Sequence, residues 1–161
     1  MPRPGISGGR AEIGFELSIR VYFQDTDAGG VVYHGAYLDY LERARTEWLR
    51  GLGFDQRELT RRFGVLFIVR TLRIAYARPA LLDDALTVTA DIDRLGRAQV
   101  TLAQQVRRGA ETLASAGVNL ACVTSVGLRP SALPAPVYDA LAADAEQEMT
   151  RHAAAVVSES G

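Results

Sequence analysis

Apolar and polar positions alternate at the start of the chain and then change period. In residues 15–23 the odd positions are apolar and the even ones mostly polar, as in a half-buried strand. A loop rich in Asp and Gly, residues 24–34, ends this strand. From about residue 35, apolar side chains recur every three or four positions, which predicts a long helix ending at Gly51 and Gly53. The apolar positions of this helix are Leu38, Leu41, Ala44, Trp48 and Leu52, and Tyr37 and Tyr40 widen its apolar side.

The rest of the chain predicts four more strands and a terminal helix. The strands cover residues 65–76, 86–92, 100–106 and 114–128, and residues 137–157 form an Ala-rich helix. Short turns join the later strands, so we expect successive strands to pair antiparallel. The predicted fold class is α+β, with a five-stranded antiparallel sheet around one long helix, plus a C-terminal helix. We expect a single domain over residues 15–157 and a flexible N-terminal segment over residues 1–14.

Composition excludes several classes of protein and of chemistry. A chain of 161 residues with 48% hydrophobic content can bury a core without metals or disulfides, and a net charge of -1 gives no reason to expect a nucleic-acid partner. All 18 basic residues are Arg, which excludes Schiff-base chemistry and a lysine base. The single Cys122 and two distant His offer no disulfide and no metal site. With no signal peptide or integral membrane segment in the sequence, we expect a cytoplasmic protein.

The loop of residues 24–34 carries the candidate chemistry. Asp25 and Asp27 follow a strand, the pair Gly29-Gly30 comes next, and a helix begins near His34. A carboxylate there can lie beside the free N–H groups and the positive dipole end of the helix. An anionic base or nucleophile facing an oxyanion-binding helix end is what hydrolysis of an activated acyl compound requires. The alternative for either aspartate is a helix cap or an Asx turn.

The same residues resemble a known family, the hotdog-fold 4-hydroxybenzoyl-CoA thioesterases. Within it, the chain is most similar to YbgC-type acyl-CoA thioesterases, which are associated with the Tol-Pal gene cluster. The likeness covers roughly residues 17–140, and the matching residues lie within 20–22, 25–34, 37–50, 69–84 and 129–134. The family implies a hotdog architecture and homodimers or homotetramers with active sites between subunits. It also implies an acyl-CoA or acyl carrier protein substrate and no cofactor besides the coenzyme A of the substrate.

The resemblance also assigns roles to residues. Asp27 matches the family's essential aspartate, the second acid of its Asp-x-Asp-x-x-Gly pattern, whereas Asp25 holds the turn. The backbone N–H of His34 matches the oxyanion donor, and its imidazole is a second catalytic candidate. Coenzyme A phosphates require arginines near the pocket mouth. The substrate-binding candidates are therefore Gly29, Gly30, Tyr33, Arg70 and Arg97. Glu42 and Glu47, in contrast, are expected on a charged helix face paired with Arg43, Arg45 and Arg50.

The function expected from the sequence is that of a hydrolase that cleaves acyl-CoA to a free carboxylic acid and coenzyme A, with Asp27 as general base or nucleophile. Two alternatives stay open. One is a hotdog dehydratase with His34 as its base. The other is a non-catalytic protein that binds acyl-CoA or an acyl carrier, or serves an envelope complex.

Overall fold

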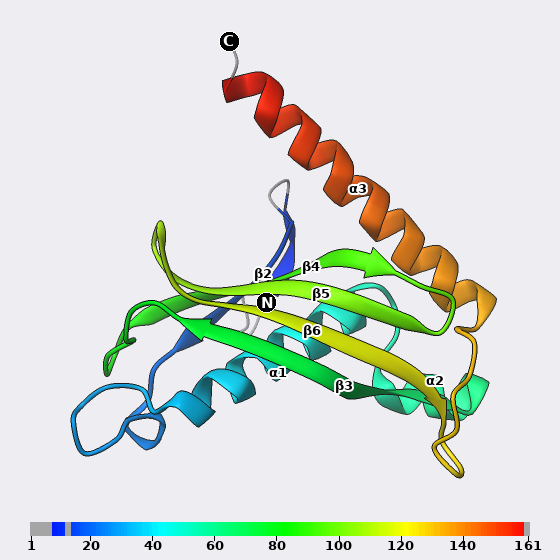
Figure 1. Cartoon of the computed structure of the whole chain (residues 1–161), viewed down its shortest axis with the longest axis horizontal. Helices are drawn as coiled ribbons and strands as arrows, with labels where there is room; N and C mark the ends of the chain where they lie inside the picture. The colour runs from blue at the N-terminus through cyan, green and yellow to red at the C-terminus, as the bar shows by residue number, and fades with distance from the viewer. Residues whose placement is uncertain (1–7, 12–13, 160–161) are drawn as a thin grey trace, which may run out of the picture.

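A curved antiparallel sheet wraps one long helix in the computed structural model, which describes residues 8–11 and 14–159 (Figure 1). Its elements in chain order are β1 (Gly8–Ala11), β2 (Gly14–Arg20), the 3-10 turn η1 (Phe23–Asp25), α1 (His34–Gly51), α2 (Gln56–Phe63), β3 (Val65–Tyr76), β4 (Ala85–Leu95), β5 (Gln99–Arg108), β6 (Glu111–Thr124) and α3 (Ala135–Glu159).

The predicted five-stranded antiparallel sheet is confirmed as β2-β4-β5-β6-β3. Strands β4, β5 and β6 form the expected succession of hairpins. Strand β3 departs from it, because it pairs with β6 and not with its successor β4. This arrangement leaves β3 at one edge of the sheet.

The N-terminal segment adds a sixth strand that the sequence pattern did not predict. Residues 8–11 pair antiparallel with the start of β2, from Gly8 opposite Leu17 to Ala11 opposite Gly14. A flexible segment was expected over residues 1–14. Residues 8–11 of that segment form a strand of the sheet instead. Residues 1–7 and 12–13 of the predicted segment lie outside the described residues.

Helix α1 is buried on the concave side of the sheet because most of its apolar positions fall on the inner side. Tyr40, Leu41 and Trp48 are at most 1% exposed and form the centre of the core. Leu38 was expected to be buried but is 41% exposed, since it lies on the opposite side of the helix. Gly53, at a φ of 98°, takes the left-handed conformation that turns the chain away after the helix.

The C-terminal helix α3 docks by its first half and then extends past the sheet (Figure 1). Val137 and Leu141 are fully buried, and the indole N–H of Trp48 donates to Asp144 Oδ2 at 2.9 Å. Among the described residues, no helix combines the length and the apolar character needed to cross a bilayer.

Candidate active site

The loop between β2 and α1 folds into a small hairpin that presents Asp27 at its tip. Thr26 bridges to Val32, and the N–H of Tyr33 donates to the carbonyl of Asp25 at 3.0 Å. Asp27 N–H donates to the carbonyl of Val31 at 2.8 Å, which closes the tip. Backbone pairing of this kind fixes the conformation of a loop that contains no buried side chain before Val32.

The side chain of Asp27 is held at one oxygen and open at the other. Its Oδ1 accepts the N–H of Gly29 at 2.8 Å, which makes an Asx turn. The residue is exposed, and its Oδ2 makes no hydrogen bond or ion pair with the described residues. An Asx turn and a catalytic role are therefore both compatible with the structure. The turn occupies one carboxylate oxygen of Asp27 and leaves the other for a substrate or a water.

The glycine pair suits this turn for two different reasons. Gly30 has a φ of 79°, which favours glycine, and its N–H donates to the carbonyl of Asp27. At Gly29 an added Cβ would lie 3.2 Å from Asp27 Oδ1, a tight contact that would shift the carboxylate by a few tenths of an ångström. Both positions thus set where the Asp27 carboxylate points.

Asp25 faces inward and has a structural role. Its Oδ2 accepts the N–H of Tyr22 at 2.9 Å, which fixes the η1 turn. The carboxylate also lies beside the buried hydroxyl of Tyr40, which has no hydrogen-bond partner within the described residues. Burial, together with the nearby charge of Asp25, raises the pKa of Tyr40 well above its ordinary value. This hydroxyl is therefore neutral at every physiological pH.

His34 begins α1, as the sequence pattern predicted, so its N–H is among the first of the helix, which have no intrahelical acceptor. The hydroxyl of Tyr76, at the end of β3, donates to the carbonyl of His34 at 3.0 Å and fixes the helix start to the sheet. An added Cβ at Gly35 would lie 2.5 Å from the Tyr33 ring, so glycine allows that ring to cover the first turn. The helix start thus combines free N–H groups with an exposed imidazole and a fixed position.

The β3–β4 connection holds the hairpin from its other side. The N–H of Val32 donates to the carbonyl of Ala80 at 2.9 Å, and Val31 bridges to Leu81. Ala80 in turn donates its N–H to the hydroxyl of Tyr37 on α1. Sequence reasoning did not single out this connection as a support, although its Pro79-Ala80 and Leu82-Asp83-Asp84 residues are part of the family resemblance.

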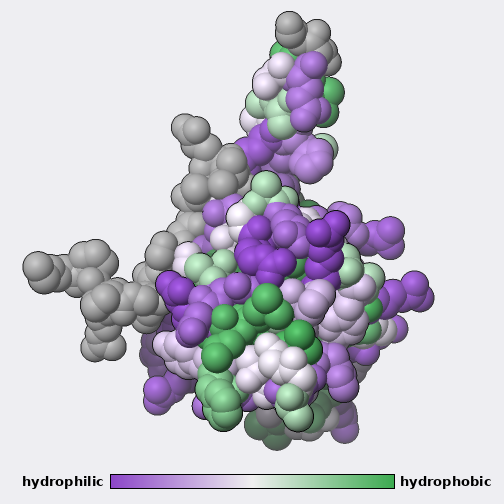
Figure 2. Space-filling view, turned by 90° about the vertical axis from the view of Figure 1, so that its left-hand side faces the viewer, coloured by the Kyte–Doolittle hydropathy of each residue, from purple (hydrophilic) through white to green (hydrophobic). Residues whose placement is uncertain are grey.

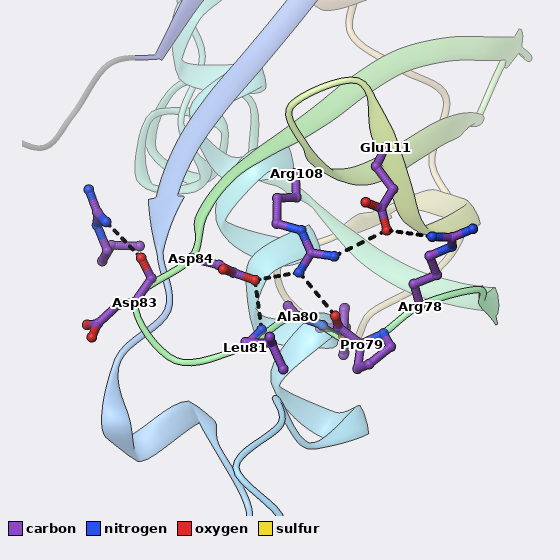
Figure 3. Close-up of polar contacts among 10 residues, drawn as sticks. Arg78, Pro79, Ala80, Leu81, Asp83, Asp84, Arg108 and Glu111 are labelled. Atoms are coloured by element: carbon purple, nitrogen blue, oxygen red, sulfur yellow. Dashed lines mark hydrogen bonds and ion pairs between the residues drawn. The ribbon is translucent and has the colours of Figure 1, made fainter.

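Arg108, on β5, organises that connection (Figure 3). Its guanidinium donates to Asp84 Oδ2 at 2.7 Å, to the carbonyl of Pro79 at 3.3 Å and to Glu111 at 3.2 Å. Burial alone would raise the pKa of Asp84, but hydrogen bonds from the Leu81 N–H and from Arg108 lower it below its ordinary value. The network therefore fixes the segment to which the Asp27 hairpin is bonded.

This end of the molecule is partly apolar and open. Figure 2 shows apolar surface beside hydrophilic surface, and Phe23, Leu81 and Leu82 are exposed large apolar side chains of these loops. Four cavities with volumes of about 270–540 Å³ lie elsewhere, and neither Asp27 nor His34 lines any of them. In a single chain, Asp27 and His34 are exposed to solvent.

The structure does not bring the two predicted arginines to Asp27. Arg70 lies on the outer face of β3, at a bulge between Val69 and Thr71, with Nη1 3.5 Å from Gln99 Oε1. Arg97 lies in the β4–β5 turn, where its carbonyl accepts the N–H of Leu133, at the far end of the sheet from the hairpin (Figure 1).

The predicted charged face of α1 is only partly confirmed. Arg50 pairs with Glu47, at 3.4 Å, as expected. Arg45 was expected on the same face but is 8% exposed, with Nη1 donating to Gln104 at 3.1 Å. Cys122 is buried in β6, and burial raises the pKa of its thiol, so it is no nucleophile. No group of three or more metal-ligating side chains occurs within the described residues.

Comparisons with known proteins identify the family. The model of the thioesterase superfamily matches residues 29–115. The acyl-CoA thioesterase YbgC of Haemophilus influenzae is 44% identical over 124 residues, which are 77% of this chain and 91% of that protein. The acyl-CoA thioester hydrolase YbgC of Escherichia coli O157:H7 is 40% identical over 121 residues, or 74% and 90%. A probable thioesterase from Bartonella henselae superposes with a TM-score of 0.70 at 37% identity, covering 74% of this chain and 98% of that one.

The site and the comparisons agree on the type of chemistry. A carboxylate with a free oxygen and a helix start with free N–H groups are the two parts that acyl transfer uses. The alignment with the Haemophilus relative extends over about three-quarters of this chain (77%) and over nine-tenths of that protein (91%). The resemblance stated from the sequence is thereby confirmed, and the chain belongs to the thioesterase superfamily.

Proposed function

We propose that this protein hydrolyses acyl-CoA thioesters to a free carboxylic acid and coenzyme A. The observation that carries the proposal is the open Oδ2 of Asp27 on a loop that is bonded to the start of α1. Two relatives that share at least 40% of their aligned residues with this chain bear names for that activity. The substrate is therefore an acyl-CoA, and the coenzyme is part of the substrate.

Two routes from Asp27 lead to the same products. In one, Oδ2 attacks the thioester carbonyl, the C–S bond breaks, and water hydrolyses the resulting anhydride. In the other, Oδ2 removes a proton from a water that attacks the carbonyl, and the proton passes to the departing thiolate. In both, the developing oxyanion is stabilised by the N–H of His34 at the helix start, where the helix dipole is positive.

The active protein in this proposal is at least a dimer. The free edge of β3 would expose unpaired backbone groups, a liability that pairing with a second copy removes. Gln56 already occupies the N–H and carbonyl of Phe67, at 3.2 and 3.3 Å, so pairing is confined to the later residues of β3. If residues 69–75 of the two copies pair antiparallel, the two-fold axis passes beside Leu72, the middle of that segment. Tyr76 of one copy then lies opposite Ile68 of the other.

This pairing would also bring the arginines of one copy toward the hairpin of the other. Arg70 would lie opposite Ile74 of the second copy, two residues from the Tyr76 that contacts its His34. In the same proposal Arg70 and Arg97 bind the phosphates of coenzyme A, while Gly29, Gly30 and Tyr33 contact the substrate near the thioester. Five expectations from the sequence stay predictions. They are an acyl carrier protein as a second substrate, a tetramer, a cytoplasmic location, a Tol-Pal association and the absence of a metal or cofactor.

Replacing Asp27 by Asn tests the assignment. Thiol release from a panel of acyl-CoAs should fall by at least about a thousandfold, because loss of a nucleophile or base removes the main catalytic group. The unfolding midpoint should change little, since the amide oxygen can still accept the N–H of Gly29. Asp25→Asn is the matched control, and its main effect should be on stability because Asp25 fixes the η1 turn.

Each other outcome has a meaning. Retained turnover in Asp27→Asn would refute the catalytic role of this residue. Tight acyl-CoA binding by the unmodified protein without thiol release would instead favour a binding protein. A change in double-bond absorbance without thiol release would favour a dehydratase.

A further inference from the structure

A charged side chain lies inside the protein at a cavity that the catalytic loop does not reach. Arg45 is 8% exposed on the inner side of α1, where apolar residues dominate. It lines a cavity of about 270 Å³ between α1, α2 and the start of β3. The other lining residues are Glu42, Thr46, Trp48, Leu49, Asp55, Gln56, Phe67, Val69 and Leu120.

A fixed network positions this guanidinium. Nη1 of Arg45 donates to Gln104 Oε1 at 3.1 Å, and Gln104 is 1% exposed. Both amide protons of Gln104 are also used, toward the carbonyls of Leu41 at 3.1 Å and Thr89 at 3.0 Å. Because Gln104 has no freedom to turn, its oxygen stays directed at Arg45.

The network leaves most of the donors of Arg45 unused. A guanidinium has five N–H groups, and Gln104 is the one hydrogen-bond acceptor found for Arg45 among the described residues. Within the same residues no carboxylate forms an ion pair with it, although the charge of Glu42 is near enough to act on it. A buried charge with unused donors is costly unless something polar enters the cavity.

The catalytic loop of the same chain is too far away to share this cavity. Arg45 follows His34 by eleven residues, which is about 16 Å along an α-helix. The pairing of β3 with a second copy changes this relation. In that pairing Ile68 lies opposite Tyr76 of the second copy, and the hydroxyl of this Tyr76 donates to the carbonyl of His34 in the same second copy. The neighbours of Ile68 in the chain, Phe67 and Val69, line the cavity. Adjacent strands are only about 5 Å apart.

We infer that the Arg45 cavity of one chain receives the far end of the acyl group bound at Asp27 of a second chain, and that Arg45 selects acyl groups carrying a neutral oxygen there. This inference rests on the proposed thioesterase function and on pairing through β3. A purely aliphatic end would leave the guanidinium donors unpaired, whereas a hydroxyl or keto oxygen accepts from them.

Two features of the cavity narrow the ligand further. Glu42 and Asp55 line it together with Arg45, so its two carboxylates disfavour an acyl group that ends in a carboxylate. Its volume of about 270 Å³ is small for a ligand site, which suits the end of an acyl group rather than the pantetheine arm. The substrate class is therefore oxygenated, uncharged acyl-CoA.

Matched substrates test the selectivity. Thiol release is measured for straight-chain acyl-CoAs and for their analogues with a hydroxyl or keto group at successive carbons. In the unmodified protein, kcat/KM should be at least about tenfold higher for one oxygenated analogue than for the plain chain of equal length, as expected for a hydrogen bond to a charged donor. Arg45→Met should reduce this ratio to near one, Arg45→Lys should keep part of it, and Arg43→Met, an exposed arginine of α1 outside the cavity, should leave it unchanged.

Mixed dimers test whether the cavity acts across the interface. Asp27→Asn chains are inactive but carry Arg45, and Arg45→Met chains carry Asp27. If the cavity serves the second chain, mixing the two and allowing exchange should restore the preference for the oxygenated substrate. If it serves its own chain, no preference returns.

Several results would overturn the inference separately from the function. Thiol release without preference for any oxygenated analogue, an unchanged preference in Arg45→Met, or no restoration in mixed dimers would each refute it while leaving the thioesterase intact. If Arg45→Met fails to fold, the substrate series on the unmodified protein still decides. No thiol release from any acyl-CoA would refute the proposed function and this inference together.

Discussion

Asp91 offers a test of how α3 is held against the sheet. The side chains of Asp91, on β4, and of Glu148 and Arg151, on α3, meet beside the backbone of Gly14. A Cβ added to Gly14 would lie only 2.8 Å from Asp91 Oδ1 and within 4 Å of the other two side chains. Burial, then the hydrogen bond and charge of Glu148, and further the charge of Asp144 raise the pKa of Asp91 to about 7, while Arg151 opposes the shift. His152 lines the adjoining cavity of about 540 Å³. At low pH the protonated Asp91 can donate to Glu148.

The sign of the effect follows from the direction of the shift. The ordinary pKa of this carboxyl is 3.8, so the folded protein binds the proton more tightly than the unfolded chain. The stabilisation is therefore complete below pH 3.8 and is lost as the pH rises to about 7. Each pKa unit corresponds to about 1.4 kcal/mol. Because Asp91 is partly accessible to water, we discount the full difference and expect about 1–2 kcal/mol.

Asp91→Asn removes the ionisation and keeps a donor for Glu148. The variant should come close to the unmodified protein near pH 3.5, just below the ordinary pKa of 3.8, and unfold at a higher temperature at pH 8.5, by about 2–8 °C for a chain of this length. Thermal unfolding followed by circular dichroism between these pH values measures it, with Asp93→Asn, an exposed neighbour at the same cavity, as control. A constant difference across the pH range, or a less stable Asp91→Asn at pH 8.5, would refute the reasoning.

Two further predictions concern the Asp27 hairpin. Arg108→Met should lower kcat about tenfold with a smaller change in KM, since the hairpin loses its support, whereas Arg78→Met, which removes only an exposed pair with Glu111 at 3.5 Å, should not. Partial recovery in Arg108→Lys would separate positioning from simple loss of folding. Gly29→Ala should lower kcat while leaving the unfolding midpoint nearly unchanged, because the added Cβ, 3.2 Å from Asp27 Oδ1, shifts the exposed carboxylate slightly. Equal kinetics for both proteins would contradict this.

Local patterns predicted most of the elements. The change from a period of two to a period near 3.6 marks the boundary between β2 and α1, and the helix ends at Gly51 as predicted. The short β1 strand was missed because residues 8–11 have no apolar alternation, and backbone pairing to β2 makes the strand. The position of β3 was also missed, since turn lengths say which strands can form hairpins but not which edge a long strand will join.

The candidate site likewise contains residues that a local motif could predict and residues that only the tertiary structure brings together. Asp27, Gly30 and His34 are neighbours in the chain, so a motif could place them on one loop and one helix start. The supports of that loop come from residues far along the chain, such as Arg108, and no local pattern connects them. The sequence was equally unable to separate Arg45 from Arg43, although one is buried and the other exposed.

The sequence by itself determined most of the elements, the family and the residues that carry the proposed chemistry, because these depend on side-chain type and on spacing within a few turns or strands. Only the tertiary structure decided which charges are buried, which carboxylate has a free oxygen and which strand edge stays open. These properties depend on contacts between segments tens of residues apart, and burial changes the energy of a charge far more than its neighbours in the chain do.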